Sequence, residues 1–386
     1  MKKSLFLLFG LIFILSNDSL HGFSIFKPFP KLTGQHLVGS SSYHWTDISR
    51  GEQPRELMIK VWYPAAINQC SELFPYMPAK MAALKNKYKV PGFLWNSFIG
   101  GVKTYAIPDS EMVFGSFQED FPVIIFSHGL GGNVDFYSAY LEDLASHGYI
   151  VIGIDHTNSC NISVFSDDRV VYIDKKFEPK NHNWLNQRWF VDLKKENKEW
   201  QKDILFVFDK LKVVNEDSTD KFYKKLNLEK VGMFGHSMGG MAAVEVCRQN
   251  SRFKVGISLD GWNSDLNSTS GIATPFLFLQ GGKSLYGGLA KKPSRRRLSA
   301  MKMNLKEYKK WGKKMREGLS KFCKNSGENC KRKIIKKAGH ATFCDVVLLK
   351  FPFKLLLNID IGNAKTYKTI REVRQSTRTF FDEYLL

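Results

Sequence analysis

Several features that define large protein classes are scarce in this chain. Six cysteines among 386 residues are too few for a disulfide-built scaffold, and 30 glycines with 13 prolines are too few for a collagen-like chain. No cysteines are spaced as a Cys-x-x-Cys zinc motif, and no loop rich in Asp and Asn offers a calcium site. No internal repeat is visible. We therefore expect a globular protein without a metal or organic cofactor.

Acidic residues are also in deficit, with 37 Asp and Glu against 57 Lys and Arg, a formal charge of +20. The excess is confined to residues 283–337, where 20 basic residues accompany three acidic ones, and the rest of the chain carries about +3. Because the basic charge is not spread over the chain, we expect no nucleic-acid partner. We interpret the stretch as a solvated basic insertion, since polar residues dominate its one helical segment, 299–322.

Apolar residues, in contrast, are plentiful. They make up 43% of the chain, with 13% aromatic, which is enough for a sizeable core and excludes global disorder. Apolar runs predict strands that alternate with amphipathic helices, which favours one α/β domain over 23–386 with a mostly parallel central sheet and helices on both faces. The expected strands are 57–63, 121–127, 149–155, 230–235, 255–260 and 275–280, and the expected helices are 137–147, 194–212 and 239–249.

The N-terminus has the pattern of a secretory signal peptide. Lys2 and Lys3 precede an apolar run that ends at Leu15 and is followed by small polar residues. This run is shorter than the roughly 20 residues of a membrane-spanning helix. We predict a signal peptide over residues 1–22, with an uncertain cut site, and hence a secreted, extracellular protein. An uncleaved anchor or an N-terminal helix inside the fold is the alternative.

The most specific local signal is Gly-His-Ser-Met-Gly at 235–239, between a predicted strand and a predicted helix. This is the context of the Gly-x-Ser-x-Gly nucleophile elbow of α/β-hydrolases, in which a tight turn exposes the serine above the strand ends. Glycines two residues before and after Ser237 relieve the crowding of that turn. The pattern predicts an α/β-hydrolase fold with Ser237 as nucleophile.

Chain order selects the partners of Ser237, because the acid and then the histidine follow the nucleophile in this fold. His340 is the only histidine downstream, so it is the candidate base. Asp260 is the favoured acid because it ends a strand, and Asp265 is the alternative. For the oxyanion hole, backbone N–H groups of Met238 and of Leu130, in a Ser-His-Gly-Leu-Gly-Gly loop, are the candidates.

Taken together and in order, the motifs closely resemble the plasma-type platelet-activating factor acetylhydrolases, which are calcium-independent, lipoprotein-associated phospholipases. The motifs are FSHGLG at 126–131, LASHGY at 144–149, GHSMGG at 235–240, LDGW at 259–262 and GH at 339–340 with Phe343 and Asp345. The resemblance covers roughly residues 30–386 and supports Asp260 as the acid. The chain departs from the family in its lysine-rich segment, 283–337.

The resemblance implies a serine esterase that cleaves the short or oxidised sn-2 acyl ester of glycerophospholipids, a 1-alkyl-2-acetylglycerophosphocholine esterase. Its implied partners are the phospholipid substrate and a lipid or lipoprotein surface. A general carboxylesterase or lipase is the alternative, and a non-catalytic hydrolase-fold binding protein is a weaker one.

Other features are less specific. Asn161 and Asn267 have the form of glycosylation acceptors. The cysteines are either partly paired, with Cys323 and Cys330 the nearest in sequence, or mostly buried as small apolar residues. Two apolar stretches are candidates for peripheral lipid contact or, equally, for core helices. The first contains Trp95 and Phe98, and the second runs over 347–357 and contains Phe351 and Phe353.

Overall fold

A computed structural model describes most of the chain. The described residues are 26–66, 73–89, 91–92, 101–113, 120–178, 187–263, 270–285, 287–288, 293, 295–350 and 361–386. The predicted signal peptide lies outside them.

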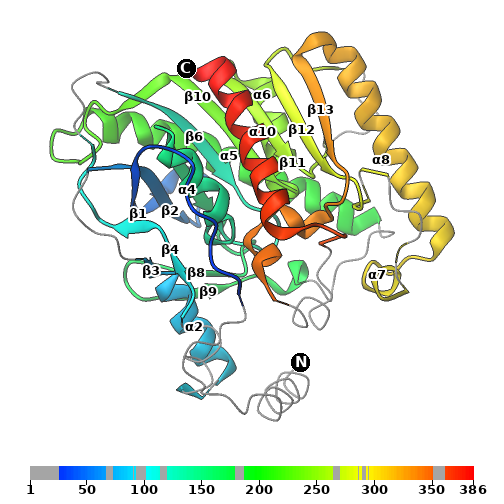
Figure 1. Ribbon diagram of the computed structural model, residues 1–386, viewed down its shortest axis with the longest axis horizontal. Helices are drawn as coiled ribbons and strands as arrows, with labels where there is room; N and C mark the ends of the chain where they lie inside the picture. The colour runs from blue at the N-terminus through cyan, green and yellow to red at the C-terminus, as the bar shows by residue number, and fades with distance from the viewer. Residues whose placement is uncertain are drawn as a thin grey trace.

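The described chain centres on a nine-stranded sheet with the order β13-β12-β11-β10-β6-β7-β2-β1-β5 (Figure 1). Neighbouring strands from β13 to β7 are parallel, whereas β2 is antiparallel to β7 and β1 is antiparallel to β2. The strands are β1 (Leu37–Asp47), β2 (Arg55–Ala65), β5 (Ala106–Pro108), β6 (Phe121–Ser127), β7 (Ile150–Asp155), β10 (Leu226–His236), β11 (Phe253–Leu259), β12 (Phe276–Gly281) and β13 (Cys330–Ile335).

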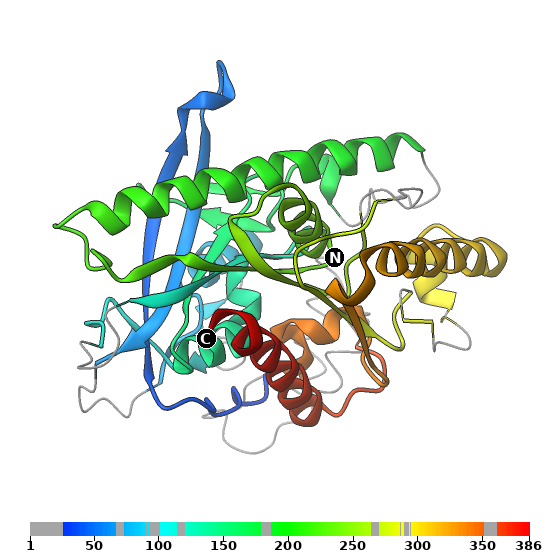
Figure 2. The same cartoon turned by 90° about the horizontal axis from the view of Figure 1, so that it is seen from above.

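Helices cover both faces of this sheet, as the alternating sequence pattern predicts. Figure 2 shows α5 and α6 on one side and α10 on the other. The helices are α2 (Pro78–Tyr88), α4 (Ser138–Ser146), α5 (Gln187–Glu216), α6 (Met238–Gln249), α7 (Arg295–Ala300), α8 (Leu305–Ser326) and α10 (Thr366–Leu385). Small two-stranded sheets pair β3 (Phe74–Pro75) with β4 (Lys103–Thr104) and β8 (Ile162–Val164) with β9 (Val170–Tyr172).

The unbroken apolar runs of the central strands follow from this two-sided cover. In β6, Val123 and Ile125 join the core under α5, α6 and α8, whereas Ile124 and Phe126 join the core under α4 and α10. Each residue of such a strand is buried because side chains alternate between two covered faces. This architecture is the α/β-hydrolase fold.

The basic stretch 283–337 contributes regular elements to this architecture. Helix α8 lies beside β13, the strand at one edge of the sheet (Figure 1). Its apolar residues join the core, and its C-terminal Cys323 forms a disulfide with Cys330 at the start of β13. The interpretation of residues 283–337 as a solvated insertion is therefore wrong for α8 and β13. These two elements form part of the α/β architecture.

The parallel strands all point the same way, so their carboxyl ends lie together along one end of the sheet. Ser237 directly follows β10, Asp260 directly follows β11, and Ser127 ends β6. Among the helices that the structure describes, none has the length and apolar character that a membrane crossing requires.

Candidate active site

Ser237 occupies the sharp turn between β10 and α6. Its backbone dihedrals are φ 55° and ψ −115°, a strained conformation for a residue other than glycine. A Cβ on Gly235 would lie 2.3 Å from the Gly239 backbone, and one on Gly239 would lie 2.1 Å from the Ser127 carbonyl oxygen. Both glycines are therefore sterically required, and the turn is the nucleophile elbow that the sequence predicts.

Two side chains from distant segments complete a hydrogen-bonded chain with Ser237. His340 Nε2 lies 3.0 Å from Ser237 Oγ, and His340 Nδ1 lies 2.6 Å from Asp260 Oδ2. Because the carboxylate can only accept, Nδ1 carries the proton and Nε2 is free to accept from the serine hydroxyl. Asp260 is fully buried, whereas 32% of the His340 side chain is exposed. The structure thus brings together the three residues singled out by motif and chain order.

The orientation of Asp260 is determined by its second carboxylate oxygen. Asp260 Oδ1 accepts hydrogen bonds of 2.8 Å from the Gly281 backbone N–H and from Ser284 Oγ. Its backbone has φ 48°, in the left-handed region. With Oδ1 occupied by these donors, Oδ2 is directed at His340. The sequence pattern does not identify Ser284 as part of the site, because its role depends on how the β12 loop folds back.

The loop after β6 lies directly against the nucleophile. A Cβ on Gly129 would come within 3.3 Å of Ser237 Cβ. Within the described part of the chain, the backbone N–H groups of Leu130 and Met238 have no hydrogen-bond acceptor. Two such donors beside the candidate nucleophile Ser237 are what an oxyanion hole requires.

The Leu130 amide is oriented through its own peptide unit. The Gly129 carbonyl oxygen accepts from Gly132 N–H at 2.8 Å and lies 2.8 Å from His128 Nδ1. His128 Nε2 in turn accepts from the His156 backbone N–H, so Nδ1 is the protonated nitrogen. In a trans peptide the C=O and N–H bonds point in opposite directions. Fixing the Gly129 carbonyl on one side therefore directs the Leu130 N–H to the other.

A second chain of hydrogen bonds joins this loop to the His340 loop. Gly129 N–H donates to Tyr137 Oη at 3.0 Å, and Tyr137 Oη lies 2.8 Å from His236 Nδ1. His236 Nε2 lies 3.1 Å from the His340 carbonyl oxygen. Burial, and then the nearby His340, hold the pKa of His236 well below its usual value, so its imidazole is neutral. Sequence reasoning missed both Tyr137 and His236 as parts of the site.

A second Ser-His-Asp set lies nearby but is sealed from solvent. His156 Nε2 lies 2.6 Å from Ser127 Oγ, and His156 Nδ1 lies 2.8 Å from Asp203 Oδ2. All three residues have no exposed surface, and Trp200 stacks on the imidazole at 3.9 Å. Because no substrate can reach Ser127, this set is structural: it holds the end of β6 and, through the His156 backbone, His128.

Other predicted residues have mixed outcomes. Trp95, Phe98, Asp265, Asn267, Phe351 and Phe353 lie outside the described residues. Asn161 is described, and its side-chain oxygen accepts from Asn133 at 2.9 Å. Of the two alternatives for the second apolar stretch, lipid contact is wrong for residues 347–349: all three are buried, and Val347 and Leu348 belong to the core cluster that includes residues of α4 and α10. Of the two alternatives for the cysteines, Cys323 and Cys330 are paired, and Cys160, Cys247 and Cys344 are buried and free.

Comparison with known proteins identifies relatives of this chain. Residues 21–285 match the family model "Platelet-activating factor acetylhydrolase, isoform II". Platelet-activating factor acetylhydrolase of Bos taurus is 26% identical over 275 residues, which cover 64% of this chain and 60% of the relative. A protein of Arthroderma benhamiae described as "Probable 1-alkyl-2-acetylglycerophosphocholine esterase" is 25% identical over 273 residues, covering 66% and 64% of the two chains. This chain matches less than two thirds of the length of either relative.

The fold likeness extends further along the chain. A solved structure of a ferulic acid esterase from Streptomyces cinnamoneus superposes with a TM-score of 0.62 at 21% identity, covering 94% of this chain and 93% of that one. At this identity the likeness concerns the fold alone. The family match ends at residue 285, so the assignment of His340 depends on its geometry beside Ser237 and Asp260.

Proposed function

Because the chain belongs to the family described as platelet-activating factor acetylhydrolase, isoform II, we propose that it is a serine esterase that hydrolyses the sn-2 acyl ester of glycerophospholipids. The hydrogen-bonded chain from Ser237 through His340 to Asp260, at 3.0 and 2.6 Å, is the observation that carries this proposal. Ser237, His340 and Asp260 are its catalytic residues.

The reaction proceeds through an acyl-enzyme. His340 Nε2 takes the proton of Ser237 as Oγ attacks the ester carbonyl, and Asp260 stabilises the imidazolium that forms. The N–H groups of Leu130 and Met238 bind the oxygen of the tetrahedral intermediate. His340 then protonates the leaving lyso-phospholipid alcohol. In the second half, His340 activates a water that attacks the acyl-enzyme and releases the carboxylic acid.

The preferred substrate is a phospholipid with a short or oxidised sn-2 acyl group, such as platelet-activating factor. The names of the relatives support this choice, since one is described by its esterase activity on 1-alkyl-2-acetylglycerophosphocholine. A general carboxylesterase is the second candidate, since the arrangement of Ser237, His340 and Asp260 suits the hydrolysis of any carboxylic ester. Because backbone donors and His340 serve the developing charges in this mechanism, the reaction is calcium-independent.

We further propose that the protein is secreted and meets its substrate at a lipid or lipoprotein surface. The predicted signal peptide supports secretion, as does the Cys323–Cys330 disulfide, a bond that persists mainly in oxidising compartments. Trp95, Phe98, Phe351 and Phe353 remain sequence-based candidates for lipid contact, and Asn161 and Asn267 for glycosylation.

Hydrolysis of acetyl-phosphatidylcholine and of long-chain phosphatidylcholine by the wild type, each with and without EDTA, tests the proposal. We expect preferential release of acetate, with no loss on chelation. Equal rates on both lipids together with faster turnover of simple soluble esters would instead identify a general carboxylesterase. Activity that is lost in EDTA and restored by calcium would contradict the proposed mechanism.

A further inference from the structure

Helix α8 has one face in the core and an opposite face that carries lysines. Its buried residues include Tyr308, Met315, Leu319 and Phe322, which join the core on the α5 and α6 side of the sheet. We define the lysine face of α8 as its exposed basic residues. They are Lys306, Lys309, Lys310, Lys313, Lys314, Lys321 and Lys324.

The charge of the lysine face is largely uncompensated. Among the described residues, only Lys313 of this set has an acidic partner, Glu317, at 3.7 Å. Several of the lysines are spaced four residues apart, as Lys306 and Lys310 are, and like charges at this spacing destabilise a helix. Some basic residues elsewhere do have acidic partners, as Arg55 has in Asp203 at 2.8 Å. The lysine face therefore concentrates positive charge within residues 283–337, outside which the chain carries about +3.

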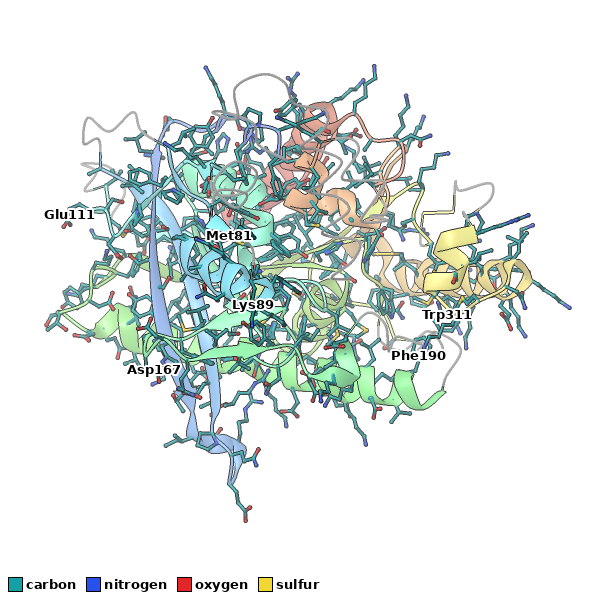
Figure 3. All side chains as sticks on the ribbon, turned by 90° about the horizontal axis from the view of Figure 1, so that it is seen from below. Met81, Lys89, Glu111, Asp167, Phe190 and Trp311 are labelled. Carbon is teal, nitrogen blue, oxygen red and sulfur yellow. A yellow bond between two sulfur atoms is a disulfide. The ribbon has the colours of Figure 1, made fainter. Side chains whose placement is uncertain are left out.

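The helix that carries the lysine face is held in place by contacts with the loop that orients Asp260. Arg316 Nη1 donates to the Leu285 carbonyl oxygen at 3.1 Å, and a Cβ on Gly312 would lie 3.0 Å from the Leu285 side chain. Leu285 follows Ser284, whose hydroxyl holds Asp260. Figure 3 shows Phe190 and Trp311 side by side where α5 and α8 begin, with ring centroids 4.8 Å apart. The first half of α8 is thus anchored, through its buried side, to the loop whose Ser284 holds Asp260.

We infer that the lysine face of α8 docks the protein on a membrane surface rich in acidic phospholipid; this inference rests on the proposed function. Every exposed basic residue of the helix is Lys, and its one arginine, Arg316, is turned toward Leu285. Lysine presents a mobile point charge that suits the diffuse charge of a lipid surface, whereas arginine suits bidentate recognition of single groups. The docking brings Ser237 to substrate that is held in aggregates.

Vesicle co-sedimentation in a Ser237→Ala background, which prevents lipid turnover, tests the inference. The test variant is Lys306→Glu/Lys310→Glu/Lys313→Glu. Its matched control is Lys198→Glu/Lys202→Glu/Lys212→Glu, which makes the same change in net charge on exposed positions of α5. We expect the control to bind vesicles containing phosphatidylserine at least tenfold more tightly than the α8 variant, with a difference that shrinks at high salt.

Two further measurements separate the possible outcomes. Hydrolysis of a soluble p-nitrophenyl ester by the same triple variants with Ser237 retained should be unchanged, which shows that they fold and that the chemistry is intact. A Lys→Gln version of the α8 variant should lose vesicle binding in the same direction but to a smaller extent, because it removes the positive charges without adding negative ones. Equal binding by the α8 and α5 variants, or tighter binding of duplex DNA than of acidic vesicles at one ionic strength, would overturn the inference. Failure to hydrolyse phospholipid despite acidic-vesicle binding would instead count against the proposed function.

Discussion

At the scale of single residues, donors and acceptors can be assigned in only one way along the hydrogen bonds that join the loop after β6 to His340. The Gly129 N–H can only donate and the His340 carbonyl can only accept. Tyr137 therefore accepts from Gly129 and donates to His236 Nδ1, which leaves the proton of neutral His236 on Nε2. Tyr137 and His236 are positioning residues, because they act on the site through the two loops that they join.

Removal of the Tyr137 hydroxyl is expected to impair turnover more than substrate binding. Tyr137→Phe leaves the Gly129 N–H and His236 Nδ1 without their partner, which loosens the loop that carries Leu130. We expect kcat to fall about tenfold to a hundredfold, below the effect of deleting an oxyanion donor outright, with KM nearly unchanged. Tyr149→Phe is the matched control, since its hydroxyl bonds Asp382 away from the site. A change in KM alone, or equal effects of both variants, would contradict the positioning role.

The buried carboxyl of Glu142 is expected to make the free energy of unfolding fall as the pH rises toward neutral. Burial raises the pKa of Glu142 to about 7, against hydrogen bonds from Thr104 and Tyr105 that favour the charged form. The folded state thus keeps a proton that the unfolded state has already released. The stabilisation is complete below the ordinary glutamate pKa of 4.5 and is lost as pH rises through about 7.

Glu142→Gln removes this proton-linked difference between the folded and unfolded states. Between about pH 5 and about pH 8, the free energy of unfolding of the wild type should fall by up to about 3 kcal/mol more than that of the variant. Urea denaturation followed by tryptophan fluorescence at the two pH values measures this difference. The same pH dependence in both proteins would show that Glu142 is not the group responsible.

At the scale of elements, the close contact of α6 with the end of β6 makes Gly239 indispensable. Alanine normally stabilises a helix relative to glycine by about 1 kcal/mol. At Gly239, however, the added Cβ would lie 2.1 Å from the Ser127 carbonyl oxygen, which is backbone and cannot swing away. We expect Gly239→Ala to lower the free energy of unfolding by about 2–3 kcal/mol, in the range of overpacked sites. Gly101→Ala, where nothing lies within 4 Å of the added Cβ, should be close to neutral in the same denaturation assay. A stabilised Gly239→Ala variant would contradict the tight elbow.

The elements that could be predicted from sequence are those with an apolar signal of their own. The central strands and helices α5 and α6 were recognisable from apolar runs and helical periodicity. Strand β1 was missed because Ser40 and Ser41 are buried within it and interrupt any alternation. Helix α10 was missed because its buried side includes polar residues, among them Arg374, which donates to the Ala139 carbonyl oxygen.

The same distinction applies to the candidate site. Ser237, His340 and Asp260 could be singled out because a local motif and chain order constrain them. Tyr137 and Ser284 could not, because they reach the site only through long-range packing. In α8, two of the buried positions are glycines, at 312 and 318, so the apolar stripe is interrupted. Together with the many lysines, this made the core-facing side of the helix hard to predict from the sequence.

At the scale of the whole molecule, the fold joins His340 to segments that lie 80 and 103 residues earlier in the sequence. The first contact of Ser237 with His340 spans 103 positions, and the contact of His340 with Asp260 spans 80. Only the parallel sheet, with the carboxyl ends of β6, β10, β11 and β12 at one edge, brings these segments together. We therefore expect the three side chains to act as one unit.

The most direct test is the turnover of acetyl-phosphatidylcholine by Ser237→Ala, His340→Ala and the double variant, with circular dichroism to verify folding. Each single substitution should lower kcat on the order of a thousandfold or more, and the double variant should lose little beyond either single one, since members of a triad act together. More than a tenth of wild-type activity in either single variant, or losses that multiply in the double variant, would contradict the joint action of Ser237 and His340.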